Sequence, residues 1–383
     1  MIQIGILTPR SKVYSSINFD FLDGLKCGLA VLGVKDIEIK TAGINFGSND
    51  KEVYAACETL VYAGCDIVVG YLNAMSAAAV QSLFINAGTL FIHLDSGYHF
   101  PLPDYKQENI FTLSLDGTLA CRILPAIAAK KGDSSFAFTC SFYDSGYRSA
   151  FGFFNGVFEA ESTVIFNHVT KLHRAEFSIE PLTKFLKNDE NTSVMIASCG
   201  DMTVDFFGNM EGEEVYTNHS LYGSPFVAEE TWLAQSPYPN NNVIALVPWA
   251  SSLDNEENKV FVEQLKKRNR KANYFSLLSW EAAIVIAKAL EADNTTDRIA
   301  LLEGYSFNSP RGVVTLDKNT HSSHSAMYET TIVENEVDGM CKLIVNGAVD
   351  QTLVQHNRER LNYEIKHLEG TVTSWLNTYG CIE

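Results

Sequence analysis

The sequence has little positive charge and lacks the cysteine pairs that bind zinc. Its 383 residues include 46 Asp and Glu but only 29 Lys and Arg, for a formal net charge of −17. Such an acidic surface repels nucleic-acid phosphates and anionic lipid headgroups, so we expect neither as a partner. The eight cysteines are scattered, with no Cys-x-x-Cys pair. This spacing argues against a structural zinc site, and a chain this long needs no disulfide staples.

Long apolar runs and a typical leader are missing as well. The longest apolar stretches, at 65–72 and 281–290, are far shorter than the roughly 20 residues that cross a bilayer. The opening MIQIGIL has neither the basic region nor the cleavage site of a signal peptide. We therefore expect a cytoplasmic protein, or a periplasmic one whose export signal was removed.

Catalytic motifs are equally absent. The sequence has no Gly-x-Ser-x-Gly elbow, no P-loop, no His-Glu-x-x-His, and no Gly-x-Gly-x-x-Gly after its first apolar run. Its nine histidines show no metal-ligand spacing. We predict a binding protein without catalytic residues, cofactor or metal. A hydrolase built from scattered residues remains a minor alternative.

What the sequence does contain is a regular alternation of short apolar runs and helical stretches. In the first part, the predicted strands are 2–7, 37–44, 66–71 and 89–94, and the predicted helices are 19–31, 49–63 and 76–87. In the second part, the predicted strands are 134–141, 163–169, 192–198, 214–221 and 242–248, and the predicted helices are 117–131, 147–159, 177–187 and 202–208. Continuous apolar strands separated by helices indicate parallel, doubly wound α/β sheets with both faces covered. The length suits two such lobes.

The last part of the chain departs from this alternation. Helices are predicted at 255–269 and 276–291, and a last helix at 355–376. Between the second and the last of these helices, SPRG is predicted to form a turn and VVTL a strand. Segments 325–334 and 340–345 are predicted to pair as a hairpin. The two histidines of HSSH (321–324) are too few to bind a metal, so this segment is interpreted as a loop.

Four segments carry a resemblance to a known family: IQIGILTP, VVGYLNAMSAAAV, YDSGY and SPRGVVTLDKNTHSSH. Their order over 3–349 resembles the type I periplasmic binding proteins, in the branch of the leucine/isoleucine/valine-binding protein and the amide sensor. The resemblance implies two Rossmann-like lobes joined by a three-stranded hinge, with a ligand held in the cleft between them. It places the chain crossings near 115–119, 248–252 and 325–331. The implied domains are 1–117 plus 252–326, 118–248 plus 327–350, and a helical extension at 351–383.

Ligands of open α/β sheets bind beyond the carboxyl ends of the strands. This rule and the resemblance together predict a set of ligand-binding residues from both lobes. The set is Tyr14, Tyr71, Ala74, Ser76, Asp95, Ser96 and Gly97 from the first lobe, and Tyr147, Asp201 and Ser220 from the second.

Most of these residues have an equally simple structural interpretation. Ser76 lies near a helix N-terminus, where it binds an anion or caps the helix. Asp95 holds a ligand amine or caps a turn, Asp201 favours a polar ligand or caps a helix, and Tyr147 contacts ligand or fills the core. The acid that relatives place near 220–222 is missing, and the nearest ones, Glu229 and Glu230, are expected on an exposed helix.

The resemblance also implies a function. We predict that the chain binds a small polar solute, an amino acid or a related amide or carboxylate, as the substrate-binding component of an ABC importer. Its partners are then the membrane subunits of that importer. The alternative is a cytoplasmic ligand sensor of the amide-sensor type, whose partner is a regulatory protein. The last predicted helix braces a lobe or forms a homodimer contact.

Overall fold

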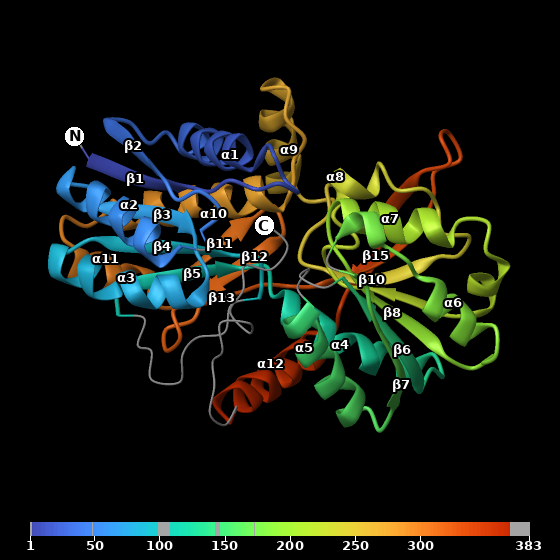
Figure 1. Cartoon of the computed structure of the whole chain (residues 1–383). Helices are drawn as coiled ribbons and strands as arrows, with labels where there is room; N and C mark the ends of the chain where they lie inside the picture. Colours follow the sequence, from blue (N-terminus) through green and yellow to red (C-terminus); the bar gives the residue numbers. More distant parts are fainter. Residues whose placement is uncertain (1, 48, 99–107, 142–145, 172, 368–383) are drawn as a thin grey trace. The chain divides into compact units, whose positions relative to one another are not determined.

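The computed structural model describes residues 2–47, 49–98, 108–141, 146–171 and 173–367, drawn in colour in Figure 1. These residues form two compact units. The first takes its residues from Met1–Leu115 and Leu253–Ser325, and the second from Asp116–Ser252 and Ala326–Glu369. Over the described residues, the chain therefore passes from one unit to the other after Leu115, after Ser252 and after Ser325.

The first unit is built on a five-stranded parallel sheet with the order β2-β1-β3-β4-β5. Its strands are β1 (Ile2–Thr8), β2 (Ile37–Gly43), β3 (Ile67–Tyr71), β4 (Leu90–Asp95) and β5 (Ile110–Ser114). Every residue of β3, β4 and β5 is buried, as expected for parallel strands covered on both faces. The four strands predicted here are confirmed within one or two residues, whereas β5 was not predicted.

Helices cover this sheet on both faces. They are α1 (Ile17–Val31), α2 (Asp50–Tyr62), α3 (Ala74–Ala87), α9 (Glu256–Lys267), α10 (Tyr274–Ala289) and α11 (Thr295–Leu302). Helices α2 and α3 share one apolar cluster with the strands. On α1, Gly24 and Gly28 allow close packing with α10, because a Cβ at Gly24 would lie 2.2 Å from the Ser279 Oγ atom.

A small antiparallel sheet completes the first unit. It consists of β11 (Ser306–Ser309), β12 (Gly312–Leu316) and β13 (Ser323–His324). It joins the edge strand β5, where the Thr112 N–H donates to the His321 carbonyl oxygen at 2.8 Å. The interpretation of HSSH purely as a loop is therefore wrong for its second half, because β12 provides a pairing edge for Ser323 and His324.

The second unit contains a seven-stranded sheet with the order β15-β14-β10-β9-β8-β6-β7. Its strands are β6 (Ser135–Cys140), β7 (Thr163–Val169), β8 (Ser193–Ala197), β9 (Leu221–Gly223), β10 (Val243–Val247), β14 (Tyr328–Glu334) and β15 (Cys341–Ala348). The five strands from β7 to β10 are parallel and repeat the order of the first unit, while the hairpin of β14 and β15 adds antiparallel to β10.

Two apolar clusters lie on the two faces of this sheet. The first involves α4 (Gly117–Lys130), α5 (Gly146–Glu159) and α12 (Gln351–Lys366), and the second α6 (Glu180–Leu186), α7 (Asp201–Met210) and α8 (Glu230–Leu233). Together, the two sheets confirm the prediction of an α/β protein with doubly wound Rossmann-like units. The predicted last helix is confirmed up to Lys366, and its remainder falls outside the described residues.

One strand prediction in this unit is wrong. Segment 214–221 forms the short 3-10 helix η2 (Glu214–Asn218), and only then the short strand β9. Tyr216 explains the difference, because its side chain is buried beside α6, where its hydroxyl shares a 2.8 Å hydrogen bond with Thr183. The Asn241 side chain binds the carbonyl oxygens of Tyr216 and His219 at 3.0 and 2.9 Å. These contacts satisfy the backbone without a sheet partner.

Candidate functional site

In the first unit, the predicted residues gather at one edge of the sheet. They follow β1, β3 and β4, which are neighbours in the order β1-β3-β4 and run parallel. Their carboxyl ends therefore meet at the same edge. The residues are Tyr14, Tyr71, Ala74, Ser76, Asp95, Ser96 and Gly97. The side chain of Ala74 is outside what the structure describes.

Tyr14 and Tyr71 form an aromatic group with Phe275 at the start of α10. The ring of Tyr14 meets the ring of Phe275 edge-on, with centroids 4.8 Å apart. The Tyr71 hydroxyl donates to the Phe275 carbonyl oxygen at 2.9 Å. Both tyrosines are buried. Their rings thus hold the first turn of α10 against the carboxyl edge of the sheet, which is a packing role.

The N-terminus of α3 is capped by Asn73, whose side-chain oxygen accepts a hydrogen bond from the Ser76 N–H at 2.8 Å. The interpretation of Ser76 as the N-cap is therefore wrong by three residues. The Ser76 hydroxyl donates to the Asp50 carboxylate at 2.6 Å and is buried. Because its single proton is already used, this hydroxyl can only accept from a further partner. It suits an ammonium or amide N–H better than a carboxylate.

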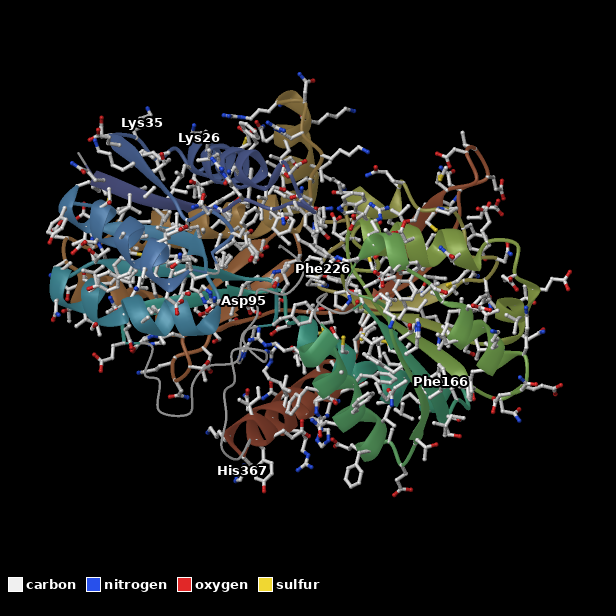
Figure 2. All side chains as sticks on the ribbon, viewed as in Figure 1. Lys26, Lys35, Asp95, Phe166, Phe226 and His367 are labelled. Atoms are coloured by element: carbon white, nitrogen blue, oxygen red, sulfur yellow. The ribbon has the colours of Figure 1, made fainter. Side chains whose placement is uncertain are left out.

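Asp95 ends β4, and its carboxylate accepts a hydrogen bond from the Ser114 hydroxyl on β5 at 2.9 Å. Asp95 is marked in Figure 2 and is only 7% exposed, as is Ser96. Its carbonyl oxygen also accepts from the Leu115 N–H at 3.1 Å. The chain then turns at Gly97, where φ is +92, a conformation that glycine adopts without strain. Asp95 thus links β4 to the end of β5.

A buried histidine lies on the same strand, two residues before Asp95. His93 is bound on both ring nitrogens, at 3.2 Å to the Thr112 hydroxyl and at 2.7 Å to the Leu72 carbonyl oxygen. Burial lowers the pKa of His93, although the charge of Asp95 acts in the opposite direction. The imidazole is therefore neutral at neutral pH. It connects three neighbouring strand ends without adding charge.

In the second unit, the predicted Tyr147 is the second residue of α5. Its side chain lies outside the described part of the chain, as do residues 143–145 of the YDSGY motif. Asp201 is the first residue of α7, and Gly200, with φ +60, occupies the N-cap position. The interpretation of Asp201 as the N-cap is therefore wrong.

The charge of Asp201 already has a partner. Its carboxylate accepts from Nη1 of Arg174 at 2.8 Å, and the same guanidinium binds Asp205 through Nε and Nη2 at 2.5 and 2.8 Å. Arg174 is half-exposed. Because the Asp201 carboxylate is already paired with this guanidinium, Asp201 gives little support for a cationic solute.

Ser220 was predicted to lie beyond the carboxyl end of a strand at 214–221. This position is wrong, because the strand lies after Ser220 instead of before it. Strand β9 begins at Leu221, so Ser220 lies at its amino end, where its hydroxyl donates to Asp133 at 3.3 Å. The residue at the carboxyl end is Ser224, whose N–H donates to the Ile196 carbonyl oxygen at 2.9 Å. The Ser224 side chain is fully buried, and its hydroxyl has no hydrogen-bond partner among the described residues. Sequence reasoning missed it, although Ser-Pro after an apolar run indicates a strand end.

The expectation that Glu229 and Glu230 lie on an exposed helix is also wrong. Glu229 is 1% exposed and caps α8, accepting from the N–H groups of Thr231 and Trp232 at 3.2 and 3.3 Å. Burial raises the pKa of Glu229 to about 7, against the lowering effect of its hydrogen bonds with Thr231 and Trp232. Glu230 accepts from both the N–H and the hydroxyl of Ser251 at 2.7 Å. Both acids therefore have structural roles.

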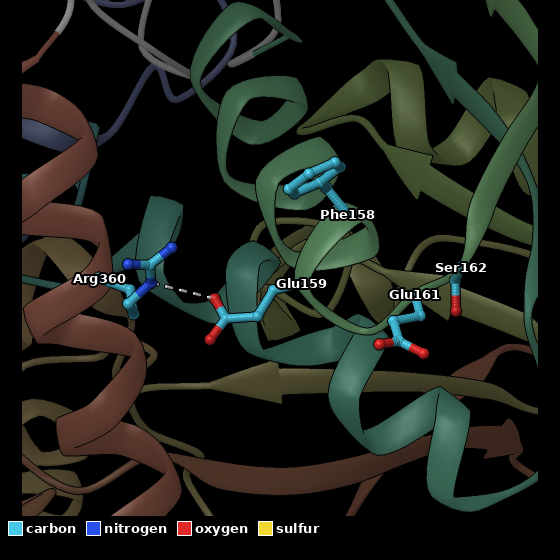
Figure 3. A pocket seen from close by; sticks show the side chains of 5 residues that line it. All are labelled: Phe158, Glu159, Glu161, Ser162 and Arg360. Carbon is cyan, nitrogen blue, oxygen red and sulfur yellow. Dashed lines mark ion pairs between the residues drawn. The ribbon is translucent and has the colours of Figure 1, made fainter.

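A hollow of about 540 Å³ lies elsewhere in the second unit, where α5 ends (Figure 3). It is lined by Phe158, Glu159, Glu161, Ser162 and Arg360, and none of these is a predicted site residue. Arg360 of α12 points to Glu159, with Nε 3.6 Å from the carboxylate. Because α5 runs back from the carboxyl end of β6, its last residues lie toward the amino edge of the sheet.

Among the described residues, no cluster of three or more His, Cys, Asp or Glu side chains has the geometry to hold a metal ion. Within the same residues, no helix combines the length and apolar character needed to traverse a bilayer.

Comparison with known proteins identifies a family. Residues 1–336 match the family model described as periplasmic binding protein. No curated protein matches the chain by sequence. Among solved structures, an ABC transporter substrate-binding protein from Sphaerobacter thermophilus has a TM-score of 0.80 at 15% identity, covering 91% of this chain and 97% of that one.

Two other solved structures have more specific descriptions. A solute-binding protein of an ABC transporter from Rhodopseudomonas palustris BisB5, in complex with 3,4-dihydroxybenzoic acid, has a TM-score of 0.75 at 15% identity, covering 91% of this chain and 97% of that one. An ABC-type branched-chain amino acid transporter protein from R. palustris CGA009 has a TM-score of 0.70 at 16% identity, covering 92% of this chain and 98% of that one. At these identities the likeness shows the fold alone.

Proposed function

The chain belongs to the periplasmic binding protein family, as its sequence resemblance predicted, and from this premise we propose that it is the solute-binding component of an ABC importer. The observation that carries the proposal is the family match over residues 1–336. The partners are then the membrane subunits of the importer, and the working location is the periplasm. We propose no catalytic step and no cofactor.

The solute is a small carboxylate, either an amino acid or an aromatic acid. Solved structures of the same fold are described with hydroxybenzoates and as branched-chain amino acid transporter proteins, which supports both classes. In the first unit, Asp95, Ser96 and Ser76 offer acceptors for an amine at one sheet edge. In the second, Ser224 offers a buried hydroxyl. A hydroxyl can donate to a carboxylate, so the second unit would hold the acidic end.

Binding is proposed to proceed by closure of the two units around the solute. A solute that contacts both units only in the closed state shifts the open–closed equilibrium by its difference in affinity for the two states. The passages of the chain after Leu115, Ser252 and Ser325 are the segments where backbone torsions must change. Tyr147, at the start of α5, remains a proposed contact from the second unit.

The test is a thermal-shift screen of the full chain with amino acids, amides and benzoates. A ligand that binds only the folded state at 100 times its Kd adds about 2.7 kcal/mol of stability, which raises the melting temperature measurably. We expect at least one amino acid or aromatic acid to do so. If every compound leaves the melting temperature unchanged at millimolar concentration, this solute class is wrong.

Two serines that flank the same strand, one at each end of β9, provide a matched test of the site. We expect Ser224→Ala to weaken binding of the identified solute by about 2- to 12-fold, the value of one hydrogen bond of about 0.5–1.5 kcal/mol. Ser220→Ala, at the opposite end of β9, should leave the affinity unchanged. Titration calorimetry measures both. Equal effects of the two substitutions would remove Ser224 from the site.

A further inference from the structure

Asp116 is the first residue of the second unit after the chain leaves the first. It stands at the N-cap position of α4 with φ +54, the left-handed conformation, and its carboxylate makes no capping hydrogen bond to the helix. Most residues with a side chain pay about 1–2 kcal/mol for this conformation, and Asp less, because its short side chain can form local hydrogen bonds. With no capping bond to α4, a partner outside this helix can stabilise the conformation of Asp116.

Arg358 of α12 provides that stabilisation. Its Nη1 and Nη2 atoms donate to the two carboxylate oxygens of Asp116 at 3.0 and 2.7 Å. The two side chains are only 10% and 12% exposed. Such a bidentate pair fixes the orientation of the carboxylate as well as its position. The contact joins residues 242 positions apart in the sequence.

Helix α12 is itself held firmly on α4. The Arg122 side chain, 1% exposed, donates to the Glu364 carboxylate through Nε at 3.1 Å and Nη2 at 2.7 Å, and also binds Asn357. Val354 and Leu361 of α12 belong to the apolar cluster of α4 and α5. Helix α12 (Gln351–Lys366) lies beyond the 336 residues that the family model matches. Arg358 thus projects from a fixed support that the family model does not include.

On the other side of the same passage, Ser114 is fixed within the first unit. Its carbonyl oxygen accepts from Nη1 of Arg311 at 2.8 Å, and its N–H donates to the Ser323 hydroxyl at 2.8 Å. Arg311 is fully buried and paired with the buried Glu281 at 2.7 Å. Only Leu115 lies between the fixed Ser114 and the fixed Asp116. Rotation at this passage is therefore confined to a few backbone torsions.

We propose that Arg358 is a positioning residue that acts through Asp116 to fix the first passage between the units, and that it thereby sets the affinity for the solute. The proposal rests on the proposed function, because it assumes that the chain binds a solute and that binding requires an ordered first passage. Arg358 acts by pre-organisation. Without it, Asp116 samples other backbone conformations, and solute binding must then bear the free-energy cost of ordering the passage.

The test compares two part-buried pairs on the same helix. Arg358→Gln removes the contact with Asp116, and Arg358→Lys keeps the charge but loses the bidentate geometry. Glu364→Gln is the matched control, because it weakens a pair of α12 that does not involve Asp116, while the Arg122–Asn357 bond and the apolar contacts still hold α12 on α4. Circular dichroism first establishes that each variant is folded.

The first measurement is amide hydrogen exchange of the full chain without solute. The reporter is the Ala120 amide, which donates to the Asp116 carbonyl oxygen at 2.9 Å. We expect Arg358→Gln to speed exchange in peptides containing Ala120 by about tenfold, Arg358→Lys to have an intermediate effect, and Glu364→Gln to leave these peptides unchanged. Equal acceleration in Arg358→Gln and Glu364→Gln, or none in Arg358→Gln, would overturn the proposal.

The second measurement is affinity, with benzoate, 4-hydroxybenzoate and leucine as probes. For each probe that binds the unaltered chain, we expect Arg358→Gln to weaken binding at least about fivefold, while Glu364→Gln stays within about twofold of the unaltered chain. A change of less than twofold in Arg358→Gln contradicts the proposal. If no probe binds the unaltered chain, the proposed function loses its support, and hydrogen exchange still decides whether Arg358 fixes the passage.

Discussion

At the scale of single residues, Glu229 is the group from which a pH dependence can be worked out. Its pKa is about 7 because burial disfavours the charged form, whereas its ordinary pKa is 4.5. Between these two values the folded state binds more protons than the unfolded state, so stability falls as the pH rises. Each unit of pKa difference corresponds to about 1.4 kcal/mol. Glu229 thus stabilises the fold less at pH 8 than at pH 5.

We therefore expect Glu229→Gln to flatten the fall in melting temperature between pH 5 and pH 8. The amide does not titrate, so the proton linkage of this position disappears. The control is Glu336→Gln, which removes an exposed carboxylate in the turn between β14 and β15. Scanning calorimetry at several pH values measures the slopes. If Glu229→Gln and the unaltered chain have the same slope, Glu229 is not protonated in the folded state.

Individual side-chain roles were only partly predictable from the sequence. Asp95 could be placed at the edge of the sheet, because it directly follows a continuous apolar run that had to be a buried strand. The position of Ser220 relative to the sheet could not be predicted, because it depends on where β9 begins. The start of β9 is determined by tertiary contacts of Tyr216. The burial of Glu229 was hidden for a similar reason. A helix of four residues, Glu230–Leu233, shows no periodicity that reveals its cap.

At the scale of elements, the pairing of α1 with α10 depends on the absence of a side chain at Gly24. A Cβ atom there would lie 2.2 Å from the Ser279 Oγ atom and 2.4 Å from the Ser276 carbonyl oxygen. The carbonyl belongs to the helix backbone and cannot turn away. We expect Gly24→Ala to lower the free energy of unfolding by about 1–3 kcal/mol or more, the usual cost of overpacking. Urea unfolding measures it, with the transition of the first unit fitted separately from that of the second.

Gly208 in α7 provides the matched control. The nearest atom to a Cβ at this position is Cγ of Pro237, 3.7 Å away, which is an ordinary contact. Because alanine favours the helix by about 1 kcal/mol over glycine, Gly208→Ala should stabilise the chain or leave it unchanged. If the Gly24→Ala variant is as stable as Gly208→Ala, then α1 and α10 can move apart without lowering the free energy of unfolding.

Helices and buried strands were predicted well where the hydrophobic pattern is long or continuous, as in Ile67–Tyr71 and Tyr274–Ala289. Strand β5 was missed although all five of its residues are buried, because a five-residue run without helical neighbours on both sides has little pattern of its own. Strand β13 was missed because its two residues pair only through contacts made with β12. Such short elements are determined by tertiary structure.

At the scale of the whole molecule, the doubly wound order in each unit follows from the alternation of strands and helices, and the sequence predicted it. The role of α12 was not accessible in the same way. Its amphipathic pattern predicted a helix that braces a lobe or forms a homodimer contact, but the partners of Arg358 and Glu364 lie more than two hundred residues earlier. No local pattern connects positions so far apart. Only the folded chain reveals that its last described helix contacts the start of α4.

The last prediction concerns the motion of the two units when a solute binds. If the solute contacts both units and the passages after Leu115, Ser252 and Ser325 act as hinges, binding favours the closed state. We expect the radius of gyration from small-angle X-ray scattering to decrease when the solute found in the thermal-shift screen is added at saturating concentration. The control is a compound that gave no thermal shift in the screen, added at the same concentration, which should leave the larger radius unchanged. Equal radii with and without bound solute, at a concentration where calorimetry proves saturation, would contradict closure while leaving solute binding itself intact.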